Sequence, residues 1–430
     1  MSLRRDFLKK AAAFAGTGSF LALANKAIAK DVAEALVSLG ERTPEMAMSD
    51  EDLWSRIQLA YTVDPNLINL NNGAVSPQPK VVQDAVDRLY HWSNETPSYY
   101  MWRIIDEGRE PLREKLAALA GVSPETIVIN RNATEGLETV IFGLELEKGD
   151  EITVCNFDYP AMKHAWKQRE MRDKIKLNWV KLDLPVEDED EIVKQYIAQF
   201  TPKTKVVHIT HVINWTGQVL PVAKICAEAN KRGIQTVVDG AHSFAHLDFK
   251  VNDLDCDYYA TSLHKWLCAP FGTGMLYVRK ERIKDLWPMY AAENPKDTDV
   301  RKLEHLGTRS IPSEMAIGNA IDFHNAIGGA RKEARLKYLK DYWVDQVKSH
   351  PKISFNSPTN KDLCGALTHF SIEGKEGKQI DKKLFYKYRI HAIPIKYEHI
   401  NGVRITPNVY TKLSDLDKLS RAVLEIADQD

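Results

Sequence analysis

The sequence predicts an α/β fold with a mainly parallel, doubly wound sheet. Short apolar segments, read as buried strands at 126–129, 150–155, 205–210 and 235–238, alternate with longer segments. In the longer segments apolar residues recur every three or four positions, which is typical of helices packed on one face. Strands that alternate with helices build parallel sheets. The length of 430 residues adds a further expectation, because it favours two domains over one.

The first half of the chain begins this alternation with two helices, at 81–92 and 105–119. The strand at 126–129 then leads into Asn132-Ala133-Thr134, where a helix should begin with Asn132 or Thr134 as its N-cap. A helix N-terminus offers unpaired N–H groups and the positive end of the helix dipole. This position therefore suits either a plain cap or the binding of a phosphate group.

The second half continues with a crossover helix at 221–232 that ends at Gly233. The sequence then predicts the remaining elements in order: strands at 257–261 and 273–278, a helix at 313–327, and a second α/β unit with a strand at 367–372 and a helix at 375–387. No internal repeat interrupts this order.

The charge and the cysteine pattern argue against some classes of binding partner and some classes of metal or redox site. The net charge is -1, which gives no reason to expect nucleic acid or an anionic membrane surface as a partner. None of the five cysteines forms a C-x-x-C pair. A zinc knuckle or a thioredoxin-type site is therefore not expected, and no metal ligands are predicted.

The N-terminus resembles a twin-arginine export signal. Arg4 and Arg5 lie in the sequence LRRDFLK, and an apolar run at 11–24 follows that is too short to span a membrane. Ala27-Ile28-Ala29 offers a small-residue cleavage site. The resemblance implies transport of the folded protein by the twin-arginine machinery to the periplasm or beyond, with no stable membrane insertion. The alternative is an amphipathic N-terminal helix.

The candidate catalytic residues lie at the carboxyl ends of two predicted strands. One strand ends in Val-Val-Asp-Gly-Ala-His-Ser and presents Asp239; the next ends in Ala-Thr-Ser-Leu-His-Lys and presents Lys265. Open α/β sheets bind ligands at the carboxyl edge of their strands, so the acid and the amine should face one crevice. The alternative is that Asp239 caps a helix and Lys265 lies on the surface, as most lysines do.

These motifs resemble the class V aminotransferases, pyridoxal-phosphate (PLP) enzymes of fold type I. The resemblance implies a mainly parallel seven-stranded sheet in a large domain and a smaller α/β C-terminal domain. The implied division is a signal peptide at 1–29, an N-terminal arm at 30–75 that contributes to the small domain, a large domain at 76–312 and a small domain at 313–430. In the family the lysine forms a Schiff base with PLP and the aspartate pairs with the pyridine nitrogen.

Further segments match the family along most of the chain from residue 67 onward. The resemblance assigns one residue, Tyr159, to stacking on the pyridine ring, although it could be an ordinary loop tyrosine. Thr308 would reach the phosphate of a partner subunit in a homodimer. The implied cofactor contacts are Ala133, Thr134, Tyr159, Asn214, Asp239, His242, Ser262, His264, Lys265 and Thr308, and the implied substrate contacts are Asn72 and Arg404.

Within the family, the overall resemblance is to the isopenicillin N epimerase-like branch. Cysteine desulfurases need a cysteine in the loop before the substrate arginine, and residues 391–404 contain none. The expected substrate is an amino acid or a peptide that contains one, activated at its α-carbon through Lys265. Epimerisation, transamination and C–S or β elimination stay open, as does the tailoring of a periplasmic siderophore peptide. A PLP-fold protein that only binds is the alternative from a different class.

Overall fold

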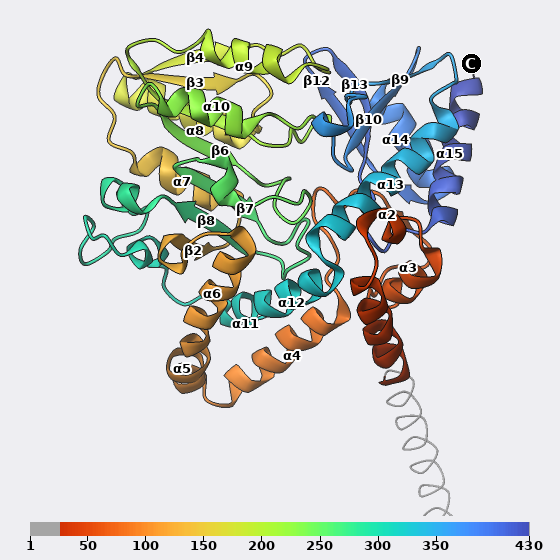
Figure 1. Ribbon diagram of the computed structural model, residues 1–430, viewed down its shortest axis with the longest axis horizontal. Helices are drawn as coiled ribbons and strands as arrows, with labels where there is room; N and C mark the ends of the chain where they lie inside the picture. Colours follow the sequence, from red (N-terminus) through yellow and green to blue (C-terminus); the bar gives the residue numbers. More distant parts are fainter. Residues whose placement is uncertain (1–25, 430) are drawn as a thin grey trace, which may run out of the picture.

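A seven-stranded sheet fills the left half of the computed structural model as drawn in Figure 1, and the model describes residues 26–429. The strand order is β2-β8-β7-β6-β5-β3-β4, and only β8 runs antiparallel to its neighbours. The predicted mainly parallel sheet is therefore confirmed. The strands are β2 (Ile127–Asn130), β3 (Glu151–Cys155), β4 (Lys176–Val180), β5 (Thr204–Thr210), β6 (Gln235–Asp239), β7 (Tyr258–Ser262) and β8 (Gly274–Val278).

Helices cover this sheet because its strands are apolar on both faces. Neighbouring residues of β6, Val237 and Val238, are both fully buried, yet they belong to different hydrophobic cores. Successive side chains of a strand point to opposite faces, so each face needs its own cover. The cover comes from α7 (Ala133–Gly143), α8 (Pro160–Asp173), α9 (Glu189–Ile197) and α10 (Val222–Asn230).

A smaller α/β unit holds the C-terminal part of the chain. Its antiparallel sheet has the order β12-β13-β10-β9 and packs against three helices through a separate hydrophobic core. The elements are β9 (Ile353–Phe355), β10 (Thr368–Ile372), β12 (Ile393–Tyr397), β13 (Ile400–Ile405), α13 (Gly329–Val347), α14 (Gly377–Tyr388) and α15 (Leu413–Asp428). The segment at 391–404, treated above as a loop, is therefore largely a hairpin.

The N-terminal segment packs against this smaller unit. It contains helical residues at 26–40, α2 (Pro44–Ala47) and α3 (Glu51–Gln58), and β1 (Ile68–Asn69) pairs with β11 (Ile390–His391). Its buried Trp54 shares a core with Trp266, the residue after Lys265. The twin-arginine motif lies outside the described residues. Within residues 26–429 no helix is long and apolar enough to cross a bilayer.

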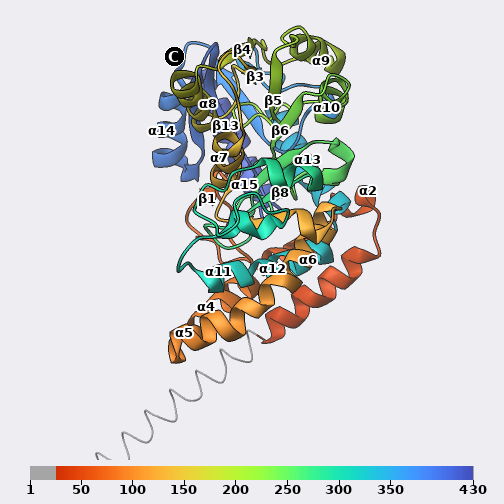
Figure 2. The same ribbon diagram turned by 90° about the vertical axis from the view of Figure 1, so that its left-hand side faces the viewer.

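Four helices form a layer beside the large sheet: α4 (Lys80–Glu95), α6 (Arg109–Ala120), α11 (Ile311–Met315) and α12 (Ile317–Ile327), which pack together in Figure 2. The helix expected at 105–119 begins four residues later, because α5 (Pro97–Tyr99) and a π-helical turn at Tyr100–Ile105 precede it. The single helix expected at 313–327 is broken at Ala316. The α4–α5 end projects from the body of the molecule (Figure 1).

Candidate active site

A cavity of about 440 Å³ lies at the carboxyl ends of β5, β6 and β7, and β12 and β13 of the smaller unit close its other side. Asp239 ends β6 and Lys265 follows β7 by three residues, so the sheet brings both to this edge. The structure brings ten of the twelve predicted site residues to the cavity wall. They are Ala133, Thr134, Tyr159, Asn214, Asp239, His242, Ser262, His264, Lys265 and Arg404.

The surroundings of Lys265 favour the neutral, reactive form of its amine. Its Nζ lies 3.1 Å from Nε2 of His242. Burial lowers the pKa of Lys265 to about 8; the charge of Asp239 opposes this shift and that of Arg404 adds to it. About a tenth of the amine is therefore neutral at pH 7, far more than for an ordinary lysine, and a neutral amine is the form that attacks a carbonyl carbon.

Asp239 supplies a buried carboxylate to the same wall. The side chain is only 5% exposed, and its Oδ1 accepts a hydrogen bond of 2.9 Å from the N–H of Ala241. Burial raises its pKa, whereas that hydrogen bond and the nearby His208 and Lys265 lower it. A buried carboxylate of this kind gains by pairing with a protonated ring nitrogen.

The N-terminus of α7 forms the third polar part of the wall. Oδ1 of Asn132 accepts from the N–H of Glu135 at 2.9 Å, so Asn132 is the N-cap. The N–H of Ala133 donates to Oγ of Ser262 at 2.9 Å, which ties the helix start to the end of β7. Ala133 and Thr134 face the cavity at the positive end of the helix dipole, where an anion is favoured.

Arg404 enters the cavity from β13 without a counter-ion. The side chain is 5% exposed; Nη1 donates to the carbonyl oxygen of Asn214 at 2.8 Å and Nη2 to Oδ1 of Asn71 at 3.0 Å. Its Nε is buried and has no partner, and within residues 26–429 the guanidinium forms no ion pair. Burial lowers its pKa to about 10. A buried arginine in this state is suited to a carboxylate ligand.

Asn72 is not among the residues that line the cavity, and its contact with a substrate stays a prediction. Its side chain is fully buried and bonded to Asn69, Tyr410 and the carbonyl oxygen of Thr406. These contacts hold the turn at the end of β1 against β13. The preceding residue, Asn71, makes the contact with Arg404 instead.

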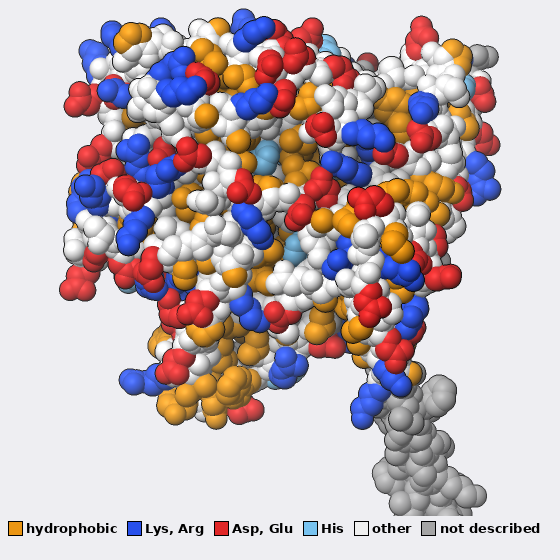
Figure 3. All heavy atoms as spheres, in the orientation of Figure 1, with side chains coloured by type: hydrophobic (Ala, Val, Ile, Leu, Met, Phe, Trp, Pro, Cys, Tyr) orange, Lys and Arg blue, Asp and Glu red, His pale blue; other side chains and the backbone are white. Residues whose placement is uncertain are grey.

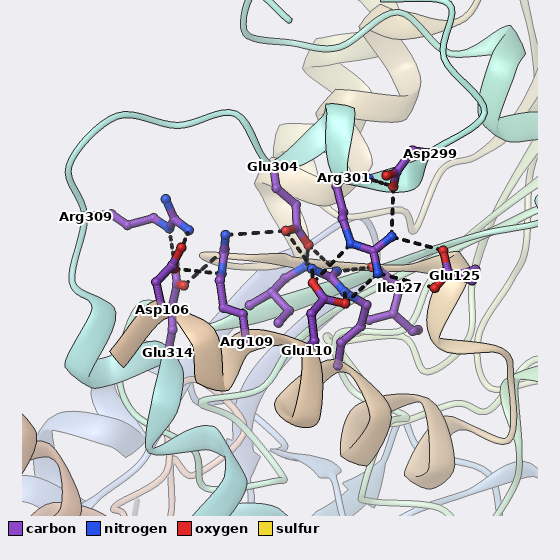
Figure 4. A network of polar contacts seen from close by, with 12 residues as sticks. Asp106, Arg109, Glu110, Glu125, Ile127, Asp299, Arg301, Glu304, Arg309 and Glu314 are labelled. Carbon is purple, nitrogen blue, oxygen red and sulfur yellow. Dashed lines mark hydrogen bonds and ion pairs between the residues drawn. The ribbon is translucent and has the colours of Figure 1, made fainter. Parts of the chain in front are cut away.

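Thr308 also lies outside the cavity of its own chain. It is exposed and follows the short helix Val300–Glu304. Glu304 fixes this segment, because its carboxylate accepts from the N–H of Ile129 at 2.6 Å and pairs with Arg113. Its ion pair with Arg109 can be seen in Figure 4. The contact of Thr308 with a partner subunit stays a prediction.

Several wall residues were missed because they come from elements that are distant in sequence. Ile393 and Ile395 lie two apart on β12 and line the cavity from the smaller unit. This alternation could have been recognised if the segment had been read as a strand. Trp215, also at the wall, stacks on Tyr397 with ring centroids 4.6 Å apart, which no local pattern indicates.

The residues present fit PLP, which carries an aldehyde, a ring nitrogen, a phenolic oxygen and a phosphate. Lys265, Asp239 and the α7 N-terminus offer an amine, a carboxylate and an anion site in one cavity. Asn214 belongs to the same cavity wall, and its Oδ1 is buried with no hydrogen-bond partner among residues 26–429. A buried polar atom of this kind needs a ligand atom or water, which the phenolic group can supply.

Comparisons with known proteins agree with this fit. Residues 68–393 match the family model for class-V aminotransferases. The chain is 30% identical over 395 residues to isopenicillin N epimerase of Streptomyces clavuligerus, covering 88% of this chain and 98% of that protein. It is 27% identical to a cysteine desulfurase of Haloferax volcanii, covering 71% of this chain and 75% of that one. Among solved structures, a mutant of C-DES with glycine covalently linked to its PLP cofactor has a TM-score of 0.75 at 23% identity, covering 86% of this chain and all of that one.

The match and the site together show a PLP-dependent enzyme. The family model spans β1 to the start of β12 and so includes both Asp239 and Lys265. The chain belongs to the class-V aminotransferase family.

Proposed function

We propose that the protein acts at the α-carbon of an amino acid, or of a peptide that contains one, in the manner of isopenicillin N epimerase. The observation that carries this proposal is the unpaired Arg404 in the same cavity as Lys265. An α-amino acid has a carboxylate and an amine on one carbon. The arginine and the site of the lysine amine can receive these two groups together.

Each residue then has a defined task. PLP, when bound, accepts the electrons that an α-carbon releases. Lys265 takes or returns the proton at that carbon, which its lowered pKa permits. Asp239 holds the ring nitrogen in its protonated form. Arg404 orients the substrate by its carboxylate, so that one particular bond of the α-carbon faces Lys265.

Desulfurase chemistry is less well supported, although a cysteine desulfurase is among the relatives. That chemistry needs a thiol at the substrate. All five cysteines are buried, and none lies among the residues that line the cavity. Transamination and β elimination need no further nucleophile, so they remain the alternatives to epimerisation.

The test is product analysis in deuterated water. The PLP-loaded protein is incubated with single L-amino acids and with short peptides. Epimerisation gives the D-epimer with deuterium at the α-carbon; transamination gives a keto acid; elimination gives a product that lacks its β-substituent. Absence of α-deuterium exchange in every substrate tested would favour a protein that binds PLP without catalysis.

We further propose a homodimer in which Thr308 contacts the phosphate at the partner's site. Two features support it. Thr308 is exposed and remote from its own cavity. Figure 3 shows hydrophobic side chains gathered over the α4–α5 end, a surface suited to association. The exposed residues there are Tyr90, Trp92, Tyr99, Trp102 and Ile104.

The dimer is tested by sedimentation and by mixed dimers. Thr308→Ala should weaken PLP binding, because a hydrogen bond to a charged group contributes about 1.5–3 kcal/mol. In a dimer of one Lys265→Ala chain and one Thr308→Ala chain, only the site of the Lys265→Ala chain should lose the phosphate contact. A monomer that binds PLP fully contradicts the proposal.

Export by the twin-arginine route is proposed from residues 3–29 alone. Export of a folded protein suits an enzyme that must acquire PLP before it leaves the cytoplasm. It would also place the substrate outside the inner membrane, where a siderophore peptide is one option. The double change Arg4→Lys and Arg5→Lys should retain the protein in the cytoplasm. Delivery of the double variant to the periplasm at the normal level, measured by cell fractionation, would contradict this route.

A further inference from the structure

His242 lies between the catalytic lysine and a buried tryptophan. Its Nε2 is 3.1 Å from Nζ of Lys265, and its Nδ1 accepts a hydrogen bond of 3.4 Å from Nε1 of Trp266. The side chain is 5% exposed and lines the cavity. Each ring nitrogen thus has one neighbour, and the nature of the two neighbours determines where the imidazole proton resides.

The direction of both hydrogen bonds follows from the indole. An indole N–H can only donate, so Nδ1 of His242 must be unprotonated to accept from it. A neutral imidazole then carries its proton on Nε2, the nitrogen that faces Lys265. This N–H can donate only to a nitrogen with a free lone pair, and the lysine amine has one only when it is neutral. An ammonium group at Nζ would point its own N–H groups at the N–H of His242.

Trp266 is itself held in place from the smaller unit. The ring of His246 stacks on the indole with centroids 3.8 Å apart and an angle of 10°. The N–H of Ala366 donates to Nε2 of His246 at 2.8 Å, so Nδ1 of His246 donates to the carbonyl oxygen of His242 at 2.7 Å. Gly365 permits this approach, because a Cβ there would lie 2.4 Å from Cε1 of His246.

We propose that His242 is a catalytic residue that favours the neutral form of the Lys265 amine by donating its Nε2–H to Nζ. Trp266 is the positioning residue that fixes this tautomer, and His246 with Ala366 holds Trp266. The inference deepens the proposed function, since it concerns the amine on which that function depends. It gives His242 a role toward the lysine, beyond the cofactor contact that the sequence predicts.

The charges around His242 and Lys265 also favour a neutral imidazole and, apart from Asp239, a neutral amine. Burial lowers the pKa of His242 well below its usual value, and Lys265, Arg404 and His246 lower it further. The groups that face Lys265 are His242, Asp239 and Arg404, of which only Asp239 favours the ammonium form. His242 therefore stays neutral throughout the range in which Lys265 titrates.

The first measurement is direct. Nitrogen-15 NMR of the full-length protein with labelled histidine distinguishes the two neutral tautomers and the imidazolium, and the spectrum of His242→Gln identifies the signal. The PLP-free protein should show His242 protonated on Nε2 alone from pH 7 to 9. A signal from the Nδ1–H tautomer, or from the imidazolium, in that range overturns the proposal.

The second measurement uses Trp266→Phe, which keeps a ring against His246 but removes the indole N–H. His242 can then turn its unprotonated nitrogen toward Lys265 and accept from the ammonium. The rate of covalent PLP capture by the PLP-free protein, followed by absorbance against pH, requires the neutral amine. Its midpoint should rise by about one pH unit, a tenfold change in the ratio of neutral to protonated amine.

A matched control is available in Trp343→Phe. Trp343 is also fully buried, and its Nε1 has no partner in the described part of the chain, so this change removes an indole N–H that sets no tautomer. Its midpoint should equal that of the wild type. Equal midpoints for Trp266→Phe and Trp343→Phe would overturn the proposal. Neither measurement needs turnover, so an incorrect substrate assignment would leave both results unchanged.

Discussion

Replacing Arg404 by methionine should strongly weaken recognition of the substrate carboxylate while leaving stability nearly unchanged. Burial lowers the pKa of this guanidinium from 12.5 to about 10. A cation whose pKa is lower in the folded state destabilises that state at every pH below the folded value, and the cost disappears as the pH rises above 12.5. At pH 7.5 a shift of this size corresponds to about 3 kcal/mol.

The loss of two hydrogen bonds offsets that gain. Arg404 donates to the carbonyl oxygen of Asn214 and to Oδ1 of Asn71. At about 1.5 kcal/mol each, the lower value for a charged donor, they contribute about 3 kcal/mol. The two effects nearly cancel, so the free energy of unfolding of Arg404→Met should differ from that of the wild type by less than about 2 kcal/mol.

Catalysis should respond much more strongly. Removing one partner of a buried charge pair costs about 2–5 kcal/mol, which is a loss of about 30- to 5,000-fold in kcat/KM for an amino acid. The assay compares that substrate with the matching amine that lacks the carboxylate. The wild type should prefer the amino acid by this factor, and Arg404→Met should show almost no preference. The PLP absorbance band should be retained.

Arg113 is a second buried arginine, and its replacement serves as the control for Arg404→Met. It is 1% exposed and pairs with Glu304 at 2.5 Å, remote from the cavity. Breaking a buried pair costs about 3–5 kcal/mol, so Arg113→Met should lower the melting temperature clearly. If Arg404→Met is destabilised as much as Arg113→Met, or keeps its preference for the carboxylate, the role assigned to Arg404 is wrong.

Three further outcomes are expected. Lys265→Ala should fold and bind PLP non-covalently, so that borohydride reduction leaves no cofactor on the chain by mass spectrometry; cofactor attached at the wild-type level would identify a different lysine. Lys265→Met, measured without PLP, should be more stable than the wild type below about pH 8, because the lowered pKa of Lys265 costs the folded wild-type protein about 3 kcal/mol there. This advantage of the variant should vanish as the pH rises toward 10.5. An advantage that is independent of pH would refute the titration of Lys265. Gly240→Ala should be strongly destabilised, since a Cβ would lie 2.0 Å from Cζ of Tyr259; a melting temperature like that of the wild type would contradict this close approach.

The sequence predicted best what depends on neighbouring residues. Each strand of the large sheet is a local apolar segment, and the residues at its carboxyl end lie at the sheet edge whatever the rest of the chain does. Asp239 and Lys265 could therefore be placed together without knowledge of any long-range contact. Arg404 was reached only through the family resemblance, because its place at the cavity depends on β13 packing beside Asn214, 190 positions earlier.

Sequence and structure differ most where a distant contact selects between adjacent residues. Asn71 and Asn72 have the same side chain, and the sequence cannot tell which one contacts Arg404. Thr406 and Tyr410 bind the amide of Asn72 and so leave Asn71 to contact Arg404. The break at Ala316 was also not predicted: both α11 and α12 contact α4, and α12 contacts α6 as well.

Backbone contacts join the loop that carries Asn214 to the smaller unit, which carries Arg404. The N–H of Val219 donates to the carbonyl oxygen of Leu363 at 2.8 Å, just beyond the loop that carries Asn214. Gly217 has a φ of +82°, and a Cβ there would lie 2.1 Å from the carbonyl oxygen of Leu367, so only glycine allows the two chains to approach this closely. Ala366, beside Leu367, holds the ring that orients Trp266. The same short segment of the smaller unit therefore sets the position of the arginine and, through Trp266 and His242, the proton arrangement at the lysine.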